Sequence, residues 1–220
     1  MINKEIKEKI KREAMEFFKN ASGCHDWSHI ERVHKLALKI GKAESADLNI
    51  IELAVFLHDI GRKEEFRQKG AFCHAEKGAD LARKILKKYN FKKDFIEAVV
   101  HCVAVHRFRK GGAPESLEAK VLFDADKLDS IGAVGIARDF LFAGGSGSNC
   151  LYTGREKELA KSDKDYSFTK EDSAFLEYEL KLKKIKDKML TKKGKEMARK
   201  RHQFMEDYFR QFWKEVAGKV

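Results

Sequence analysis

The stretch Leu57-His58-Asp59-Ile60-Gly61-Arg62 constrains this chain more than any other part of its sequence. It ends an apolar run over residues 50–57 whose spacing predicts a buried helix. Burying a neutral imidazole beside a carboxylate costs free energy unless a partner satisfies both groups. A divalent transition metal is the usual partner, because histidine nitrogen and aspartate oxygen together suit such ions. We therefore predict that other segments fold back around His58 and Asp59 and complete a metal site.

The rest of the sequence favours an all-α fold. Apolar residues recur at helical spacing almost throughout, few runs alternate with period two, and Pro114 is the single proline among 220 residues. The expected helices cover residues 3–20, 27–40, 47–58, 74–89, 93–107, 116–142, 170–191 and 193–216. The charged residues 62–67 are expected to form a loop.

Three parts are expected along the chain. Residues 1–145 would form a helical core, which a chain of this length is able to bury. Residues 146–168 are polar and rich in glycine and serine at their start, so we expect a flexible flap or linker. Residues 169–220 would form basic helices packed on the core.

Cysteine usage and hydropathy indicate the compartment. The four cysteines are scattered without a C-x-x-C pair, which is typical of reduced thiols rather than of a disulfide framework. The sequence shows no signal-peptide-like apolar segment and no apolar run long enough to cross a bilayer. We expect a soluble, cytoplasmic protein without a membrane partner.

The net charge of +11 is concentrated near the C-terminal end. Residues 181–201 contain eleven Lys or Arg and two acids, Asp187 and Glu196. Such a run is either a solvated helix face or a surface that attracts phosphate-rich ligands or nucleic acid.

Four side chains are candidate metal ligands: His29, His58, Asp59 and Asp126. Each lies at or near the end of an apolar helical run, where it is held rigidly and still faces a pocket. Asp26 is a suitable N-cap, which would place His29 in the first turn of its helix. Taken alone, His29 is better explained as a hydrogen-bonded residue at a helix start than as a ligand, and Asp126 is compatible with a solvated helix residue. Their combination in one small helical domain favours the metal site.

The order His29, His58-Asp59, Asp126 resembles the H…HD…D signature of the HD-domain superfamily of metal-dependent phosphohydrolases. Three segments carry the resemblance: His25-Asp26-Trp27-Ser28-His29-Ile30-Glu31-Arg32-Val33, Leu57-His58-Asp59-Ile60-Gly61 and Asp124-Ala125-Asp126-Lys127-Leu128-Asp129-Ser130-Ile131-Gly132-Ala133. The resemblance implies an all-α HD-domain bundle with one divalent metal on His29, His58, Asp59 and Asp126. The family's Ala-Asp-Lys/Arg-Leu pattern assigns the last ligand to Asp126 rather than Asp124.

The implied chemistry is hydrolysis of a nucleotide or related phosphate ester by a metal-activated water. The ion could be Mn, Co, Ni, Fe, Zn or Mg. Asp59, Arg62 and Lys127 are the expected catalytic residues, with Arg62 and Lys127 also binding substrate phosphate. For Arg62 an ordinary surface ion pair is an equally good explanation, and for Lys127 the surface ion pair is the better one. Some nucleotidase branches of the family carry an acid where this chain has Arg62, so their general-acid role is not transferred here.

Two further histidines, His74 and His106, lie between the HD pair and Asp126. In some branches of the superfamily two histidines in this interval bind a second metal. The alternative is that both bind substrate phosphate as hydrogen-bond donors, and the two alternatives remain open. His101 is expected in the core. The Gly-Tyr-Pro motif of the cyclic-dinucleotide phosphodiesterases is absent, since the loop reads Lys110-Gly111-Gly112-Ala113.

The competing function is a nucleic-acid-binding module, or a nuclease or phosphodiesterase, that uses the basic C-terminal helices. No recognised nucleic-acid motif or stacking aromatic cluster accompanies the basic run. Neither the substrate nor the oligomeric state follows from the sequence.

Overall fold

The computed structural model describes residues 2–19, 23–67, 73–107, 112–145, 147–148, 150–162, 164, 166 and 169–220. All regular elements in these ranges are helices, which confirms the predicted all-α fold. None of the described helices is both long and apolar enough to cross a membrane. The chain divides into two compact units, Met1–Asp126 and Lys127–Val220.

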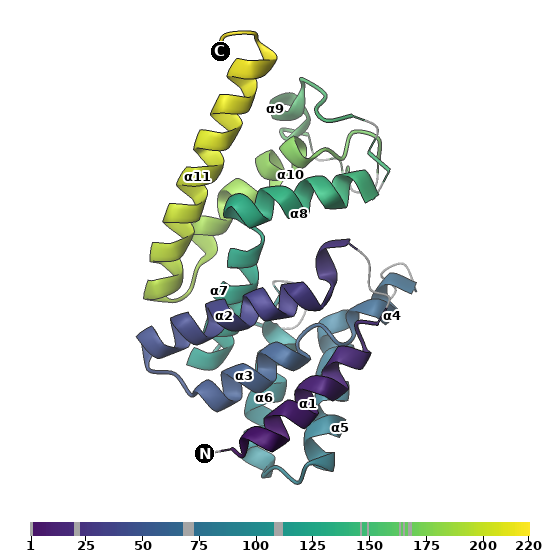
Figure 1. Ribbon diagram of the computed structural model, residues 1–220, viewed down its shortest axis with the longest axis vertical. Helices are drawn as coiled ribbons and strands as arrows, with labels where there is room; N and C mark the ends of the chain where they lie inside the picture. The colour runs from purple at the N-terminus through teal and green to yellow at the C-terminus, as the bar shows by residue number, and fades with distance from the viewer. Residues whose placement is uncertain are drawn as a thin grey trace. The chain divides into compact units, whose positions relative to one another are not determined.

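The first unit is built around α3 (Leu48–Leu57), whose Leu53, Ala54, Val55 and Leu57 are fully buried. A helix that is apolar on nearly all sides needs neighbours on all sides. These neighbours are α1 (Lys4–Glu16), α2 (Trp27–Glu44), α5 (His74–Lys88) and α6 (Lys93–Val105), and α5 packs on α6 (Figure 1). The short η1 (Gly23–His25) precedes α2, and α7 (Leu117–Asp129) closes the unit.

Capping side chains set the starts of the helices that carry the predicted ligands. The Asp26 carboxylate accepts a hydrogen bond from the His29 amide, which confirms the predicted N-cap. The Asp47 carboxylate caps α3 by accepting from the Asn49 amide. Ser116 Oγ accepts from the Ala119 amide at the start of α7. Each cap fixes where its helix begins and hence which side chains lie in its first turn.

The expectations for residues 62–67 and 116–142 are wrong. Residues 62–67 form the helix α4 (Arg62–Arg67) rather than a loop, since Arg, Lys and Glu are good helix formers as well as soluble ones. The expected helix over 116–142 is two helices, α7 and α8 (Gly132–Gly145). They separate because Gly132 has φ +81°, a left-handed conformation that glycine adopts without strain.

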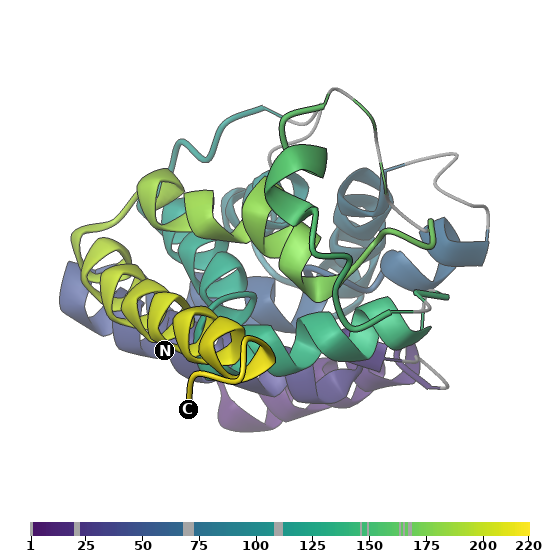
Figure 2. The ribbon, with the colours of Figure 1, turned by 90° about the horizontal axis from the view of Figure 1, so that it is seen from above.

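The second unit contains α8, α9 (Glu156–Leu159), α10 (Ala174–Leu180), the 3₁₀ helix η2 (Leu182–Lys188) and α11 (Lys192–Val216). The expected helix over 170–191 is therefore two shorter elements. Helix α11 packs along α8 and η2, and α10 packs on α8 and α9 (Figures 1 and 2). An aromatic cluster around Phe175, whose ring centroid lies 4.4 Å from that of Phe212, lies between α10 and α11.

The described part of 146–168 includes α9, so it is not wholly irregular. Residues 108–111, part of the expected loop before Pro114, lie outside the described residues, as do 146, 149, 163, 165, 167 and 168. The flap and the packing of the basic helices on the core remain predictions.

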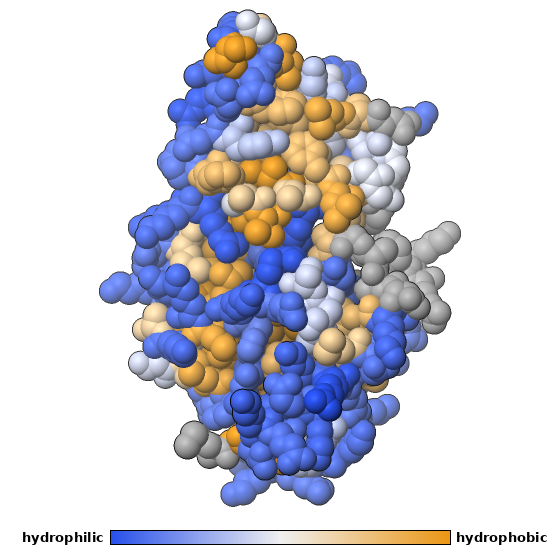
Figure 3. All heavy atoms as spheres, in the orientation of Figure 1, coloured by the Kyte–Doolittle hydropathy of each residue, from blue (hydrophilic) through white to orange (hydrophobic). Residues whose placement is uncertain are grey.

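The face of the second unit seen in Figure 3 carries apolar side chains over the region of α8 and α10. Leu141 on α8 and Leu151 after it are more than half exposed, at 56% and 54%. Another apolar surface can pack on an exposed hydrophobic patch of this kind.

A close backbone approach joins the turn after α3 to the start of α5. A Cβ atom added at Gly61 would lie 2.4 Å from the His74 carbonyl oxygen, and one added at Gly78 would lie 3.3 Å from the His58 carbonyl oxygen. Both positions need glycine because a side chain would separate the two backbones. The contact places His74 beside Asp59.

We predict that Gly61→Ala lowers the free energy of unfolding by about 3 kcal/mol, because backbone rather than a flexible side chain must move. Chemical denaturation measures the loss. Gly144→Ala is the matched control: it lies in a helix with nothing within 4 Å of the added carbon, so its stability should stay equal or rise. Equal midpoints for Gly61→Ala and the wild type would contradict the close approach.

Candidate metal centre

The four predicted ligands come together inside the first unit. His29 lies in the first turn of α2, His58 is the C-cap of α3, Asp59 follows it, and Asp126 lies near the end of α7. His29 Nε2 lies 3.4 Å from Asp126 Oδ1 and 3.9 Å from Asp59 Oδ2. His58 Nε2 lies 4.0 Å from each of the same two oxygens. Two atoms bound to one ion at about 2.1 Å each lie at most about 4.2 Å apart, so these distances suit a shared ion.

His74 and His106 form a second cluster on the other oxygen of the same carboxylate. Asp59 Oδ1 lies 3.1 Å from His74 Nε2 and 3.4 Å from His106 Nε2, and the two nitrogens are 3.2 Å apart. Asp59 therefore faces His29 and His58 with Oδ2 and the second cluster with Oδ1. Two groups have the ligand types and spacing of a metal site: His29 with His58 and Asp126, and Asp59 with His74 and His106.

Burial and charge set the protonation of the cluster. Burial lowers the pKa of His58 to about 4 and also lowers the pKa of His106. Burial opposes ionisation of Asp59, but the guanidinium of Arg62 and the imidazole of His58 outweigh it, so its pKa lies well below the usual value. Neutral imidazoles around an ionised carboxylate are the forms that bind a metal.

One buried atom tests whether a metal fits. His58 Nδ1 donates to the Val55 carbonyl oxygen at 2.8 Å, which leaves a lone pair on Nε2. Nε2 is buried and has no hydrogen-bond partner within the described part of the chain. A ring nitrogen oriented by a backbone carbonyl on its other side is the usual arrangement of a metal-binding histidine. The residues present therefore fit a divalent ion.

The two predicted phosphate-binding cations have different surroundings. Arg62 Nε donates to Asp59 Oδ2 at 2.9 Å, and the arginine is only partly exposed, so it both orients the carboxylate and presents positive charge to the solvent. Lys127 follows Asp126 along α7 and is the first residue of the second unit. Its role at the site remains a prediction.

Three features differ from what the sequence indicated. Arg107, which the sequence analysis did not select as a site residue, donates through Nη1 to His74 Nδ1 at 2.8 Å. Its position directly after His106 was the one sequence signal that could have placed it at the site. His101 is half-buried rather than in the core, and its ring accepts a hydrogen bond from the Glu115 amide. Asp124 is completely buried although only Asp126 of the pair joins the cluster.

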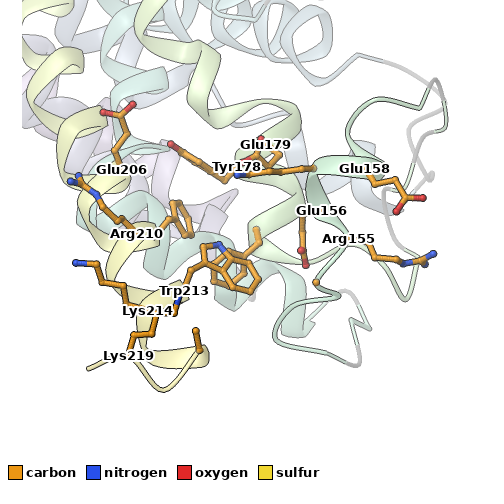
Figure 4. Close-up of a pocket in the computed structure, with 15 residues that line it drawn as sticks. Arg155, Glu156, Glu158, Tyr178, Glu179, Glu206, Arg210, Trp213, Lys214 and Lys219 are labelled. Atoms are coloured by element: carbon orange, nitrogen blue, oxygen red, sulfur yellow. The ribbon is translucent and has the colours of Figure 1, made fainter.

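A separate hollow of about 970 Å³ lies within the second unit, between α11, α10 and the segment around α9. Figure 4 shows Tyr178 and Trp213 at its centre, with charged side chains such as Glu206, Arg210 and Lys214 around them. None of the predicted metal ligands lines it. The hollow is therefore distinct from the candidate metal centre.

Comparison with known proteins agrees with this geometry. The family model described as "HD domain" matches residues 26–131. The chain is 33% identical to YpgQ of Bacillus subtilis (strain 168), over 98% of this chain and 97% of YpgQ. The crystal structure of Bacillus subtilis YpgQ in complex with ADP is similar with a TM-score of 0.74 over 97% of this chain and 100% of that one.

The chain belongs to the HD-domain superfamily. An HD-superfamily hydrolase from Bacillus thuringiensis is also similar, with 29% identity and a TM-score of 0.70 over 97% of both chains. HD-superfamily membership supports a metal-dependent hydrolase, and the two His/Asp clusters are where this HD protein could hold metal.

We predict that the stability of the metal-free protein falls as the pH is lowered from about 6.5 to about 4. The folded pKa of His58 is about 4 against an ordinary 6.5, so in this window the unfolded chain binds a proton that the folded chain does not. This linkage contributes stability above pH 6.5 that is lost towards pH 4, in total about 3 kcal/mol.

Denaturant unfolding at each pH in the presence of a chelator measures this dependence. His58→Gln should reduce the slope of the unfolding free energy against pH by the equivalent of about one bound proton. His101→Gln, which lies outside the cluster, controls for the loss of a histidine. The same pH dependence in His58→Gln and the wild type would mean that His58 is not held neutral.

Proposed function

We propose that this chain is a divalent-metal-dependent phosphohydrolase that cleaves a nucleotide or a related small phosphate ester with a metal-activated water. The observation that carries the proposal is that His29 and His58 lie near both Asp126 Oδ1 and one oxygen of Asp59, while His74 and His106 lie near the other oxygen of Asp59. A nucleotide is favoured because YpgQ, which matches over almost its whole length, binds ADP in its crystal structure.

The protein's own residues prepare the site for this reaction. His29, His58, Asp59 and Asp126 would hold the ion, one of Mn, Co, Ni, Fe, Zn and Mg. When bound, such an ion polarises a phosphoryl oxygen and lowers the pKa of a bound water towards neutrality. Arg62 fixes the orientation of Asp59 and adds positive charge where phosphate arrives. Lys127 is assigned a second phosphate contact on the sequence pattern alone.

His74 and His106 contribute to substrate binding in this proposal. The His74 ring carries its hydrogen on Nε2, because an arginine only donates and Arg107 therefore needs a lone pair on Nδ1. The Nε2–H group donates to His106 Nε2 at 3.2 Å and lies 3.1 Å from Asp59 Oδ1, and it is a donor from which a phosphate oxygen can accept a hydrogen bond. Whether His106 binds phosphate or metal depends on the number of ions.

We predict that Asp59→Asn abolishes metal binding and nucleotide hydrolysis together, because it removes the charge shared by both clusters. Arg62→Ala should keep the metal and lower turnover about 10–100-fold, since it supports a ligand without being one. Elemental analysis and a panel of nucleoside mono-, di- and triphosphates with each divalent ion measure both effects.

Lys63→Ala is the matched control for Arg62, since the Lys63 ammonium contacts the Lys19 carbonyl oxygen instead of the cluster. Its turnover should match the wild type. Full turnover by Asp59→Asn without metal would overturn the assignment of the site, and loss of metal from Arg62→Ala would make Arg62 part of the metal-holding structure.

A second candidate function, nucleic-acid binding, rests on one observation in the second unit. Six cations on η2 and the first two turns of α11 make no side-chain ion pair within the described residues; we call them the basic face: Lys184, Lys186, Lys188, Lys192, Lys195 and Arg199. By contrast, Lys181 and Lys183 pair with Glu177 and Glu179. Cations without acid partners are the ones available to phosphates of a nucleic-acid backbone.

We predict that, if the basic face binds duplex nucleic acid, replacing Lys184, Lys186 and Lys188 by Gln reduces the slope of log affinity against log salt by about 3. Replacing the paired Lys181 and Lys183 should reduce it less. Affinities at several salt concentrations measure the slopes. Binding that is absent at low salt, or unchanged in the triple variant, would leave this surface as a solvated helix face.

A further inference from the structure

The histidine rings of the two clusters are held in two different ways. His58 and His106 each donate from Nδ1 to a backbone carbonyl three residues earlier, at 2.8 Å to Val55 and 2.7 Å to Val103. Both rings therefore carry their hydrogen on Nδ1 and present the Nε2 lone pair to the cluster. This is the tautomer that a metal needs from an Nε2 ligand.

His74 has the opposite arrangement. Its Nδ1 is 2.8 Å from Nη1 of Arg107, and a guanidinium has hydrogens to donate but no lone pair to offer. The Nδ1 atom must therefore be the acceptor, which places the ring hydrogen on Nε2. That hydrogen is donated to the lone pair of His106 Nε2 at 3.2 Å, and Asp59 Oδ1 lies 3.1 Å from the same His74 nitrogen. The hydrogen occupies the position between these atoms where a second metal ion would otherwise bind.

We propose that Arg107 keeps the second cluster free of metal by holding His74 in the tautomer with hydrogen on Nε2, so that the HD centre works with one ion. This inference rests on the proposed function, since it assumes that the first cluster binds an ion. The positive charge of Arg107 beside the cluster acts in the same direction, because it repels a second cation. His74 then remains a hydrogen-bond donor to His106 Nε2 or to a phosphate oxygen.

The position of Arg107 explains why this contact is available. Residue 106 is the C-cap of α6, so Arg107 is the first residue past the cap, and His74 is the first residue of α5. The packing of α5 on α6 brings these two helix ends together. His74 is completely buried and Arg107 half-buried, so little water competes for the Nδ1 lone pair.

Substitutions at position 107 separate the tautomer from the charge. Arg107→Lys keeps a cationic donor and should keep one ion per chain. Arg107→Met removes both the donor and the charge. Arg107→Gln also removes the charge, and its amide oxygen can accept a hydrogen from His74 Nδ1, which favours the metal-binding tautomer. We expect a second ion per chain in Arg107→Gln and Arg107→Met, more tightly bound in the former.

The measurement is the number of Mn²⁺ ions per chain at saturation, by equilibrium dialysis with elemental analysis. Nitrogen-15 NMR of the histidine rings in the metal-free protein reports each tautomer directly, with His74→Asn assigning the signal. We expect one ion and an Nε2–H ring at His74 in the wild type, and a shift to Nδ1–H in Arg107→Gln.

The outcomes distinguish a failure of this inference from a failure of the proposed function on which it rests. Three outcomes would each overturn the role of Arg107 while leaving the metal-dependent enzyme in place. They are two ions in the wild type, one ion in both the wild type and Arg107→Gln, and an Nδ1–H ring at His74 in the wild type. No ion in the wild type would overturn the metal centre and this inference with it. One ion that becomes two in Arg107→Gln, but not in Arg107→Lys, supports it.

Discussion

The buried carboxylate of Asp59 is the group on which the organisation of the first unit depends. An ionised carboxylate that is 3% exposed is tolerated only if positive charge and hydrogen-bond donors surround it. Arg62 supplies a full charge from one side, and the histidine rings enclose the two oxygens from the others. The same arrangement creates two sets of ligand atoms around one anion, so the requirement for burying Asp59 and the requirement for binding a cation are met by one structure.

The surrounding helices serve to hold these groups at fixed positions. Apolar burial of α3 fixes the His58-Asp59 turn, the Asp26 cap fixes His29, and the close approach at Gly61 and Gly78 fixes His74. Each ligand thus sits at a helix end whose position is determined by packing rather than by the ligand itself. A rigid frame of this kind keeps catalytic groups in place without a bound substrate.

Much of this could be predicted from the sequence, because its signals are local. Helical periodicity, the Asp26 cap and the His58-Asp59 pair all depend on residues near one another in the chain. The break at Gly132 could not be recognised, since a glycine is tolerated inside helices and its left-handed φ depends on the local turn. The helix over 62–67 was missed because charged residues suit helices and loops alike. The contact of Arg107 with His74 joins residues 33 positions apart, and the tautomer it imposes depends on tertiary placement alone.

The positions of His29 and Asp126 at opposite ends of the first unit's sequence have a consequence for the life of the protein. An ion bound to both would crosslink the two residues, would close most of that unit into one loop, and would favour the folded state over the unfolded chain. Chains that lack the ion would open more often and become substrates for cellular proteases. The supply of the metal would then set how much of this protein persists in the cell as well as how fast each copy works.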